Sequence, residues 1–426
     1  MFRQTIVWLK IISKILGIAG SELKRQLRFT RVRLQRRFSE QAPPPGPAKN
    51  IVVVGANFAG FFAAEILAKS LLPSSGYQVV VIEPNSHFQF SWLLPRFCVV
   101  EGHEHKAFIP YEGWRKNLPD GILQWVKDRV VSISRSHVKL RDGTEIQYEY
   151  LIIATGSGVE EGLPSRVNHT EKLEGIRRLQ EMQKGIKAAK SVVIVGGGAA
   201  GVEVATDAKD LYPEKQVTIV HSRDALMHRF GKKLQDEALE GMQKLGVDVI
   251  LGERVLAEDA AMGTVTLSSG TVLHCDKFVN CTGQKPTSGL MKELSPSSIA
   301  ETGHIRVKPT LQVADDTLPN VYACGDVADT GVPTPNARSA SRQAAVAADN
   351  ILASIRGRQP SYAYQYSWPV DSFIKLTLGL YRSTTYMGDG KESVVFRSKE
   401  KIDLMSEFVW QRFGSKPFED DNLKSD

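Results

Sequence analysis

The stretch NIVVVGANFAG, residues 50–60, decides the fold, because a continuous apolar strand leads through a glycine-rich turn into a helix. A second strand, residues 78–82, ends in Glu83, 23 residues after Gly60. Glycines let a pyrophosphate approach the helix N-terminus, and an acid at the end of the second strand can accept a ribose hydroxyl. Asn57 replaces the usual second glycine, and asparagine tolerates unusual backbone angles. The pattern predicts a dinucleotide site built from Gly55, Asn57, Phe58, Ala59, Gly60 and Glu83.

A second copy of the pattern, SVVIVGGGAAGVE, occupies residues 191–203. It again joins an apolar strand to a glycine turn and a helix, and another strand follows at residues 216–220. One such turn could be an ordinary glycine-rich loop, but two in the same strand–turn–helix context make that interpretation remote. The second copy predicts a further dinucleotide site, built from Gly196, Gly198, Ala200 and Gly201.

A longer internal repeat pairs the two copies. VKLRDGTEIQYEYLIIATG, residues 138–156, aligns without gaps on VTLSSGTVLHCDKFVNCTG, residues 265–283. Each segment predicts a hairpin that turns at Asp142-Gly143 or Ser269-Gly270, and then a buried strand that ends in Thr-Gly. The ends of these strands add Ala154, Thr155, Gly156, Thr282 and Gly283 to the candidate site residues.

These elements predict an α/β protein with two Rossmann-like dinucleotide-binding domains, each carrying a β-hairpin insertion, and a small C-terminal α+β domain. The length of 426 residues agrees with two or three domains.

Charge and cysteine content exclude several other classes of protein. Residues 1–49 hold eleven Lys or Arg against two acids, so the remaining residues sum to −2 of a total of +7. A nucleic-acid-binding body is therefore not expected, because its basic surface would lie on the folded domains. Four cysteines lie far apart without any Cys-x-x-Cys pair, which disfavours metal clusters, a disulfide framework and a redox dithiol. We expect no metal site.

The N-terminal segment, residues 1–48, is basic, amphipathic and poor in acids, and PPPGP at residues 43–47 predicts a linker. Its apolar run, residues 6–18, is too short and too interrupted by lysine to span a bilayer, which takes about 20 apolar residues. Three interpretations stay open: a mitochondrial presequence, a retained membrane-surface helix or short anchor, and a solvated extension. The expected location is accordingly mitochondrial, or peripheral to a membrane.

The chain resembles the flavoprotein family with two dinucleotide-binding domains. The resemblance rests on the two glycine loops, Ala154-Thr155-Gly156, TGQKP at residues 282–286 and NVYACGD at residues 320–326, in this order over about residues 50–355. It implies that the first loop and Glu83 hold the ADP half of FAD, and that Gly325 and Asp326 bind its ribityl and phosphate region. It further implies an FAD domain at 49–160 and 285–357, an NAD(P) domain at 161–284 and an interface domain at 358–426.

Further segments resemble the apoptosis-inducing-factor-like subgroup, which includes NAD(P)H:quinone reductases. They are FIPY at 108–111, Trp114, FIKLTLG at 373–379 and TYMGDG at 385–390. The resemblance implies that Glu203 positions the nicotinamide. Lys106 is a candidate for a positive charge near the flavin, although an exposed-loop lysine is at least as good an interpretation. His103 and His105 flank Glu104, but nothing else in the sequence completes a metal site, so a surface loop is the better interpretation.

The second ribose-binding strand ends in His221-Ser222-Arg223, where NAD-specific sites place an acid. No carboxylate repels a 2′-phosphate there, and Arg223 could bind one. We therefore expect the protein to use both NADH and NADPH.

The expected function is an FAD-dependent NAD(P)H oxidoreductase that passes hydride from nicotinamide to flavin and electrons on to a quinone-like small molecule, without a redox disulfide. The alternative is a slow NADH oxidase, resembling apoptosis-inducing factor, that acts as a redox-switched binding protein. A reductase for an iron–sulfur protein would need a basic docking face, which the near-neutral body disfavours. A homodimer is compatible with each of these functions.

Overall fold

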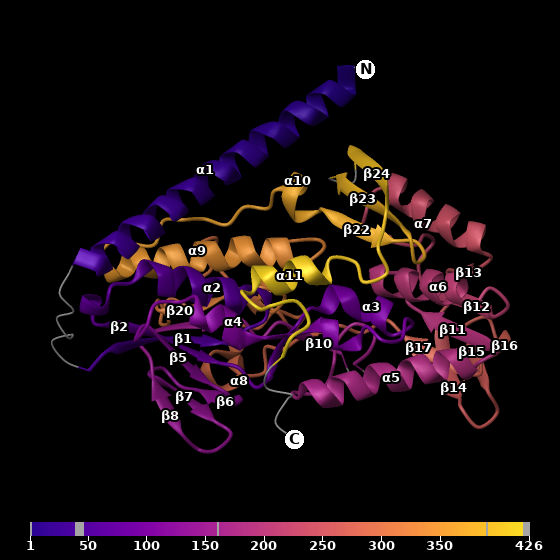
Figure 1. The fold of residues 1–426 in the computed structure, drawn as a ribbon, viewed down its shortest axis with the longest axis horizontal. Coiled ribbons are helices and arrows are strands. Elements are labelled where there is room, and N and C mark those ends of the chain that lie inside the picture. Colours follow the sequence, from indigo (N-terminus) through magenta and orange to yellow (C-terminus); the bar gives the residue numbers. More distant parts are fainter. Residues whose placement is uncertain (1, 39–46, 160–161, 389–390, 421–426) are drawn as a thin grey trace. The chain divides into compact units, whose positions relative to one another are not determined.

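The computed structural model describes residues 2–38, 47–159, 162–388 and 391–420 (Figure 1). Most of the expected linker and two residues of the TYMGDG segment therefore lie outside the described residues. The chain forms two compact units. We call residues 1–86, 112–158 and 285–371 the first unit, and residues 87–111, 159–284 and 372–426 the second unit.

The first unit is built on a five-stranded parallel sheet in the order β20-β9-β1-β2-β5. Its strands are β1 (Lys49–Val54), β2 (Tyr77–Ile82), β5 (Leu123–Val126), β9 (Tyr150–Ile153) and β20 (Val321–Ala323). The inner strands are buried on both faces, as their continuous Val and Ile content predicts. Helices α2 (Phe58–Ser70) and α9 (Ala337–Ile355) lie side by side in this unit (Figure 1).

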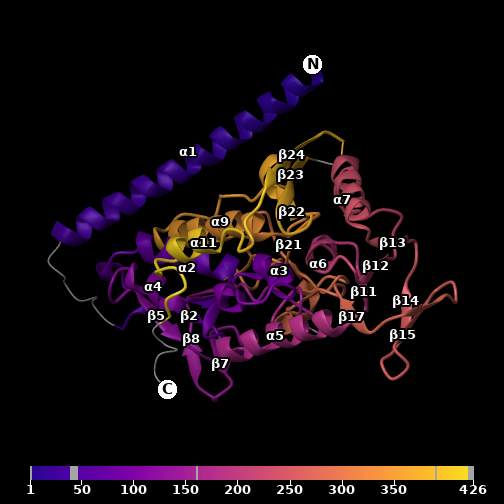
Figure 2. The ribbon, with the colours of Figure 1, turned by 45° about the vertical axis from the view of Figure 1, so that its right-hand side comes forward.

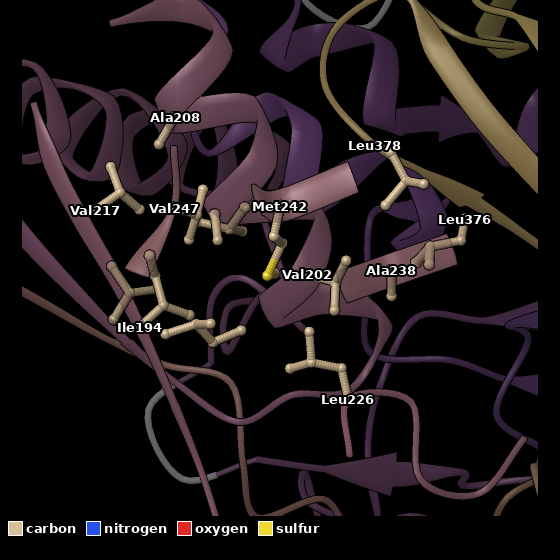
Figure 3. Packing of buried hydrophobic residues seen from close by; sticks show 14 of the residues in the cluster. Ile194, Val202, Ala208, Val217, Leu226, Ala238, Met242, Val247, Leu376 and Leu378 are labelled. Atoms are coloured by element: carbon tan, nitrogen blue, oxygen red, sulfur yellow. The ribbon is translucent and has the colours of Figure 1, made fainter. Parts of the chain in front are cut away.

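The second unit contains a four-stranded parallel sheet in the order β13-β12-β11-β17. Its strands are β11 (Ser191–Val195), β12 (Gln216–His221), β13 (Asp248–Leu251) and β17 (Lys277–Asn280). The same unit contains three helices, α5 (Lys172–Ala188), α6 (Ala199–Leu211) and α7 (Lys232–Leu245). Figure 3 shows apolar side chains of β11, β12, α6 and α7, including Ile194, Val202 and Met242, that pack into one buried cluster.

The predicted repeat is confirmed. β7 (His137–Leu140) pairs antiparallel with β8 (Glu145–Gln147), and β15 (Thr264–Leu267) pairs in the same way with β16 (Val272–His274). Each hairpin gains a third strand, β6 (Val130–Ile133) or β14 (Val255–Asp259). Gly143 and Gly270 turn the hairpins with φ of 92° and 85°, a conformation that favours glycine. The predicted fold, two Rossmann-like cores with hairpin insertions, is therefore confirmed.

The C-terminal residues of the second unit form a three-stranded antiparallel sheet and a short helix. The elements are β22 (Ile374–Thr377), β23 (Arg382–Gly388), β24 (Ser393–Lys399) and α11 (Ser406–Arg412). Residues 358–371, which we expected in the same interface domain, are grouped by their contacts with the first unit. The functional domain boundaries stay a prediction.

The N-terminal segment forms one helix, α1 (Phe2–Phe38), in the first unit (Figure 2). It runs without interruption through the apolar run at residues 6–18 and the arginine-rich residues that follow it. Among the described residues, no helix combines the length and apolar character needed to cross a membrane.

The remaining elements are short. They are β3 (His87–Gln89), α3 (Leu94–Phe97), β4 (Phe108–Pro110), α4 (Tyr111–Lys116), β10 (Ser157–Gly158), β18 (Lys285–Pro286), α8 (Met291–Leu294), β19 (Ile305–Arg306), β21 (Ala328–Asp329), α10 (Trp368–Asp371) and the 3₁₀ turns η1 (Pro73–Ser75), η2 (Ser91–Leu93), η3 (Glu104–Ala107) and η4 (Pro296–Ser298).

Candidate dinucleotide-binding sites

The candidate residues of the first unit gather at one edge of its sheet. Gly55 follows β1, Glu83 follows β2, Ala154 follows β9, and Gly325 follows β20 after one intervening residue. Since all these strands run parallel, their carboxyl ends share an edge. Ligands of open α/β sheets bind at this edge.

The first glycine turn is tight in a way that only glycine permits. A Cβ on Gly60 would lie 1.8 Å from the carbonyl oxygen of Gly55, and a Cβ on Gly55, whose φ is +93°, would lie 2.7 Å from the carbonyl oxygen of Ala154. The turn therefore brings the N-terminus of α2 against the ends of β1 and β9. First-turn N–H groups of a helix lack a carbonyl partner within the helix, so they are available to a phosphate.

Asn57 fits this turn for a different reason from the one that the sequence suggested. It is the N-cap of α2, with an extended backbone at φ −79° and ψ −172°, and its Oδ1 accepts from Phe58 N at 3.0 Å. Gly198 has nearly the same angles in the second loop, and a Cβ there would meet open space. This position therefore does not require glycine, and no unusual backbone angle is involved.

Glu83 contacts the first loop directly. Its Oε2 accepts from Ala56 N at 2.5 Å and its Oε1 from Asn85 N at 2.8 Å. Burial raises the pKa of Glu83, while these two hydrogen bonds oppose the rise. Each carboxylate oxygen has a second lone pair, so Glu83 can still accept from a ribose hydroxyl.

The segment that contains Gly325 and Asp326 packs against the start of α2. A Cβ on Gly325 would lie 2.9 Å from Ala59 Cβ, and Gly325 N donates to the buried Gln343 Oε1 of α9 at 2.8 Å. Ser157 Oγ donates to Asp326 Oδ2 at 3.3 Å. The sequence did not point to Gln343, because it lies inside an alanine-rich helix and its partner is 18 residues away.

Thr155 and Gly156 are held by the chain just beyond β18. Thr155 Oγ1 donates to the carbonyl oxygen of Thr287 at 2.7 Å, and Thr287 N donates to the carbonyl oxygen of Gly156 at 2.9 Å. These contacts and the glycine turn bring several backbone segments together at the sheet edge, and we call such a group of segments a cradle. Its backbone groups suit the pyrophosphate and ribityl parts of FAD. The residues present therefore fit that cofactor.

The second unit repeats the same construction. A Cβ on Gly201 would lie 1.9 Å from the carbonyl oxygen of Gly196, whose φ is +112°. Gly198 is the N-cap of α6, so Ala200 and Gly201 lie in its first turn. Thr282 and Gly283 follow β17, and Thr282 N donates to Asn280 Oδ1 at 2.9 Å. The residues thus fit a second dinucleotide.

The predicted ribose end of this second site carries histidines instead of an acid. His221 Nδ1 accepts from Gly197 N at 3.0 Å, and His221 Nε2 lies 3.2 Å from His228 Nδ1. Since Nδ1 accepts, the proton lies on Nε2 and His221 donates to His228. Burial, together with His228 and Arg223, lowers the pKa of His221 to about 4, so the ring is neutral at pH 7. Arg223 is exposed beside this pair.

Glu203 lies on the buried side of α6, where its Oε1 accepts from Thr377 N at 3.1 Å. Burial raises its pKa to about 8. One turn further along, Asp207 Oδ2 accepts from Arg96 Nε at 2.6 Å. Arg96 also donates to the carbonyl oxygens of Leu380 and Gly379 at 2.8 and 3.0 Å. The role of Glu203 toward a nicotinamide stays a prediction.

Lys106 lies among C-terminal residues of the second unit. Its Nζ is 3.2 Å from Asp403 Oδ2 and 4.5 Å from the centre of the Phe418 ring, and its carbonyl oxygen accepts from Trp410 Nε1. Its role beside the flavin stays a prediction. Over the described ranges, no three His, Cys, Asp or Glu side chains group in a way that could hold a metal ion.

Residues 49–349 match the family described as pyridine nucleotide-disulphide oxidoreductase, and the chain belongs to this family. It is 33% identical over 389 residues to Fe-regulated protein 8 of Mycosarcoma maydis, a match that covers 86% of this chain and 95% of that protein. It is 31% identical to ferroptosis suppressor protein 1 of Homo sapiens, over 75% of this chain and 84% of that protein.

Solved structures share the fold. A sulfide:quinone oxidoreductase from Aquifex aeolicus superimposes with a TM-score of 0.67 at 17% identity, over 86% of this chain and 90% of that chain. A NAD-dependent persulfide reductase from A. fulgidus gives a TM-score of 0.62 at 21% identity over 80% of this chain, which spans only 64% of that longer protein. The protein is thus an oxidoreductase with FAD and NAD(P)H as its cofactors.

Proposed function

We propose that the protein is an FAD-dependent NAD(P)H:quinone oxidoreductase. The main support is that two dinucleotide cradles of the same construction lie at the carboxyl edges of two parallel sheets, one in each unit. The resemblance to NAD(P)H:quinone reductases and the sulfide:quinone oxidoreductase among the structures of this fold point to a quinone as acceptor.

In this proposal, Gly55, Gly60, Glu83 and Asp326 hold FAD, while Gly196, Gly201 and the His221 pair hold NAD(P)H. Bound FAD supplies the hydride-accepting chemistry that joins the two-electron donor to the acceptor. The overall reaction converts NAD(P)H, a proton and a quinone into NAD(P)⁺ and a hydroquinone. The protein contributes the orientation of the reacting groups and the exclusion of water.

Glu203 would position the nicotinamide as a neutral acid. Because its pKa is raised to about 8, its carboxyl group carries a proton at pH 7 while Oε1 accepts from Thr377 N. The protonated oxygen can then donate to the carboxamide oxygen. A neutral donor in this place also avoids a buried negative charge beside the cofactor.

Electrons would pass from the flavin to the acceptor without a thiol relay. All four cysteines are free, three of them are buried, and burial raises the pKa of Cys324 to about 12. A thiolate is the reactive form of cysteine, so Cys324 is a poor nucleophile although it precedes Gly325 in the FAD cradle.

Anaerobic mixing tests the proposal. Purified protein mixed with NADH, and separately with NADPH, should lose its flavin absorbance, and short-chain quinones should restore it within the turnover time. Slow reoxidation by every quinone, with a long-lived charge-transfer band and a change of oligomeric state, would instead favour the redox-switched binding protein. Relatives named apoptosis-inducing factor homolog in Dictyostelium discoideum keep that second candidate in view.

The mitochondrial location and the homodimer stay proposals. Fractionation of cells followed by measurement of the mature N-terminus tests the first, and light scattering of the purified flavoprotein tests the second. A mature chain that begins after residue 38 would identify α1 as a presequence.

A further inference from the structure

Helix α1 turns three of its arginines, Arg25, Arg28 and Arg36, toward the rest of the first unit. Arg25 and Arg28 both pair with Asp349 of α9, at 3.3 and 2.7 Å. Arg36 donates to the carbonyl oxygens of Ala68, at 2.9 Å, and Leu71. Those carbonyls lie at the C-terminal end of α2, where a helix has unpaired acceptors and a partial negative charge.

The same face of α1 carries its buried apolar residues. Ile11 and Val32 are only 2% and 6% exposed, and Ile18 is half-buried. From Ile11, Ile18, Arg25 and Val32 follow at intervals of seven residues, and Arg36 follows four residues after Val32. In an α-helix with 3.6 residues per turn, such intervals keep side chains on one side.

The opposite face of α1 is apolar and exposed. Leu16, Leu23 and Leu27 are 61–65% exposed. The full set, which we call the outer stripe, is Trp8, Ile12, Ile15, Leu16, Leu23, Leu27 and Leu34. Its members recur mainly at intervals of four and seven residues. A helix on the surface of a water-soluble domain has the reverse arrangement, with apolar residues inward and charges outward.

Basic side chains run along both edges of the outer stripe. At about 100° per residue, Lys24 and Arg31 fall on one edge and Arg33 and Arg37 on the other. All four are exposed. Glu22 is the only acid between Phe2 and Phe38, and it pairs with Arg25. The exposed face therefore combines leucines with a border of positive charge, the pattern of a helix that lies in a membrane interface.

We propose that α1 lies in the plane of an anionic membrane surface, with the outer stripe in the acyl boundary and its basic borders on lipid headgroups, while Asp349 and the end of α2 clamp the helix to the first unit. The occupant is a lipid surface and not a second copy of this chain, because two such faces would bring basic borders together. At 1.5 Å per residue, the outer stripe from Trp8 to Leu34 gives a contact line of about 40 Å.

The contacts of α1 with Asp349 and with the end of α2 would also fix the orientation of the first unit on the membrane. α2 begins at the first glycine turn and ends at the carbonyls that accept from Arg36. One helix thus joins the FAD cradle to the membrane-bound helix. The first unit would therefore be held at a fixed orientation over the bilayer, in contrast to a body tethered by a flexible anchor. This inference does not depend on which acceptor the enzyme uses.

Flotation of the full-length flavoprotein with vesicles tests the lipid contact. We expect binding to phosphatidylcholine vesicles that contain phosphatidylserine, and at least tenfold weaker binding to phosphatidylcholine alone. The double variant Leu23→Glu/Leu27→Glu should lose at least tenfold in binding to the anionic vesicles. Leu256→Glu is the matched control, because Leu256 is equally exposed, at 68%, but lies on β14 of the second unit.

Three results would overturn the lipid proposal: no binding to anionic vesicles, unchanged binding of the double variant, or equal loss in the Leu256→Glu control. A wild-type dimer that becomes monomeric in the double variant, without vesicle binding, would assign the outer stripe to a second copy instead. Flavin content and circular dichroism verify that each variant is folded.

Hydrogen exchange tests the clamp separately. In Asp349→Asn, the amides of residues 22–36 should exchange at least tenfold faster than in the wild type, while flavin content stays unchanged. Asp316→Asn is the control, since Asp316 belongs to the same unit. Among the described residues, its side chain forms an ion pair with Lys308 and not with α1. Equal exchange in Asp349→Asn and the wild type would refute the clamp.

Discussion

At the scale of single residues, two glycines have the most demanding positions. Gly60 and Gly201 each lie in the first turn of a helix, and each would place a Cβ within 2 Å of the carbonyl oxygen of the first glycine of its loop. An alanine in a helix is normally more stable than glycine by about 1 kcal/mol. At these two positions the steric overlap outweighs that gain.

Gly60→Ala should therefore purify with less than half of the wild-type flavin, because the loop must open to admit the methyl group. Gly201→Ala should keep its flavin and bind NADH at least tenfold more weakly. The ratio of flavin to protein absorbance and a titration with NADH measure the two effects. Gly20→Ala is the control, because a Cβ there meets nothing within 4 Å. Full flavin content in Gly60→Ala would contradict the assignment of the first loop.

The raised pKa of Glu203 leads to a prediction about how flavin reduction depends on pH. Its pKa of about 8 means that it is a hydrogen-bond donor at pH 7 and an anion well above pH 8. NADH-dependent flavin reduction should therefore slow as pH rises through 8. Glu203→Gln, which always has a donor, should lack this decline and should reduce flavin faster than Glu203→Ala at pH 7. Identical pH profiles for the wild type and Glu203→Gln would contradict the role.

The same group affects stability in a defined direction. In the folded protein the pKa of Glu203 is raised from 4.5 to about 8, so between these values the folded state binds more protons than the unfolded state. Its contribution to the free energy of unfolding therefore falls as pH rises through this range, and levels off above about 8.

The neutral ring of His221 leads to a prediction about the choice between NADH and NADPH. A neutral imidazole neither repels a 2′-phosphate nor binds the ribose as an acid would. Rates with NADH and NADPH should agree within about tenfold in the wild type. His221→Asp should shift the ratio of kcat/KM at least tenfold toward NADH, and Arg223→Ala should weaken NADPH alone. A thousandfold preference of the wild type for either cofactor would contradict this interpretation.

At the scale of elements, the acidic face of α6 holds the C-terminal sheet of the second unit. Asp207 and Asp210 lie one turn apart, and Asp210 Oδ2 accepts from Leu380 N at 2.8 Å. Arg96 completes the link from α3, and both members of the Arg96–Asp207 pair are at most 1% exposed. Removal of one member leaves the other as an uncompensated buried charge.

Arg96→Met should lower the free energy of unfolding by about 3 to 5 kcal/mol. Chemical denaturation of the flavoprotein, followed by circular dichroism, measures this loss. Arg177→Met is the control, because among the described residues Arg177 forms ion pairs with Glu174 and Glu181 of the same helix, α5. This variant should leave the denaturation midpoint unchanged. A similar midpoint for Arg96→Met and the wild type would mean that the pair is not needed to hold α6 to the chain segment between β22 and β23.

The sequence could predict the glycine loops and hairpins, but it could not predict the contacts of Arg96 between distant elements. The glycine loops and hairpins were predictable, because turn, cap and strand are set by residues close together in the chain. Arg96 was not, since its partners Asp207 and Leu380 are 111 and 284 residues away. No local pattern marks an arginine whose partners belong to other elements, although the spacing of Glu203, Asp207 and Asp210 does mark an acidic helix face.

At the scale of the whole molecule, the duplication was predictable and the division of the chain was less so. The gapless repeat at 138–156 and 265–283 correctly predicted two equivalent Rossmann-like cores. Residues 87–111 nevertheless belong by their contacts to the second unit, although they continue the sequence of the first. Such a return of the chain depends on packing between distant segments, which composition and periodicity do not encode.

The burial of three cysteines affects how the protein responds to oxidants and thiol-modifying reagents. Burial raises the pKa of Cys98, Cys275 and Cys324, so all three resist electrophiles and peroxides. Cys281 is only partly buried, so NADH-dependent flavin reduction should survive treatment with N-ethylmaleimide or dilute hydrogen peroxide in a Cys281→Ser variant. An enzyme that passes electrons to its acceptor without a thiol relay, as proposed above, would continue to work during oxidative stress, when dithiol-dependent reductases are inactivated.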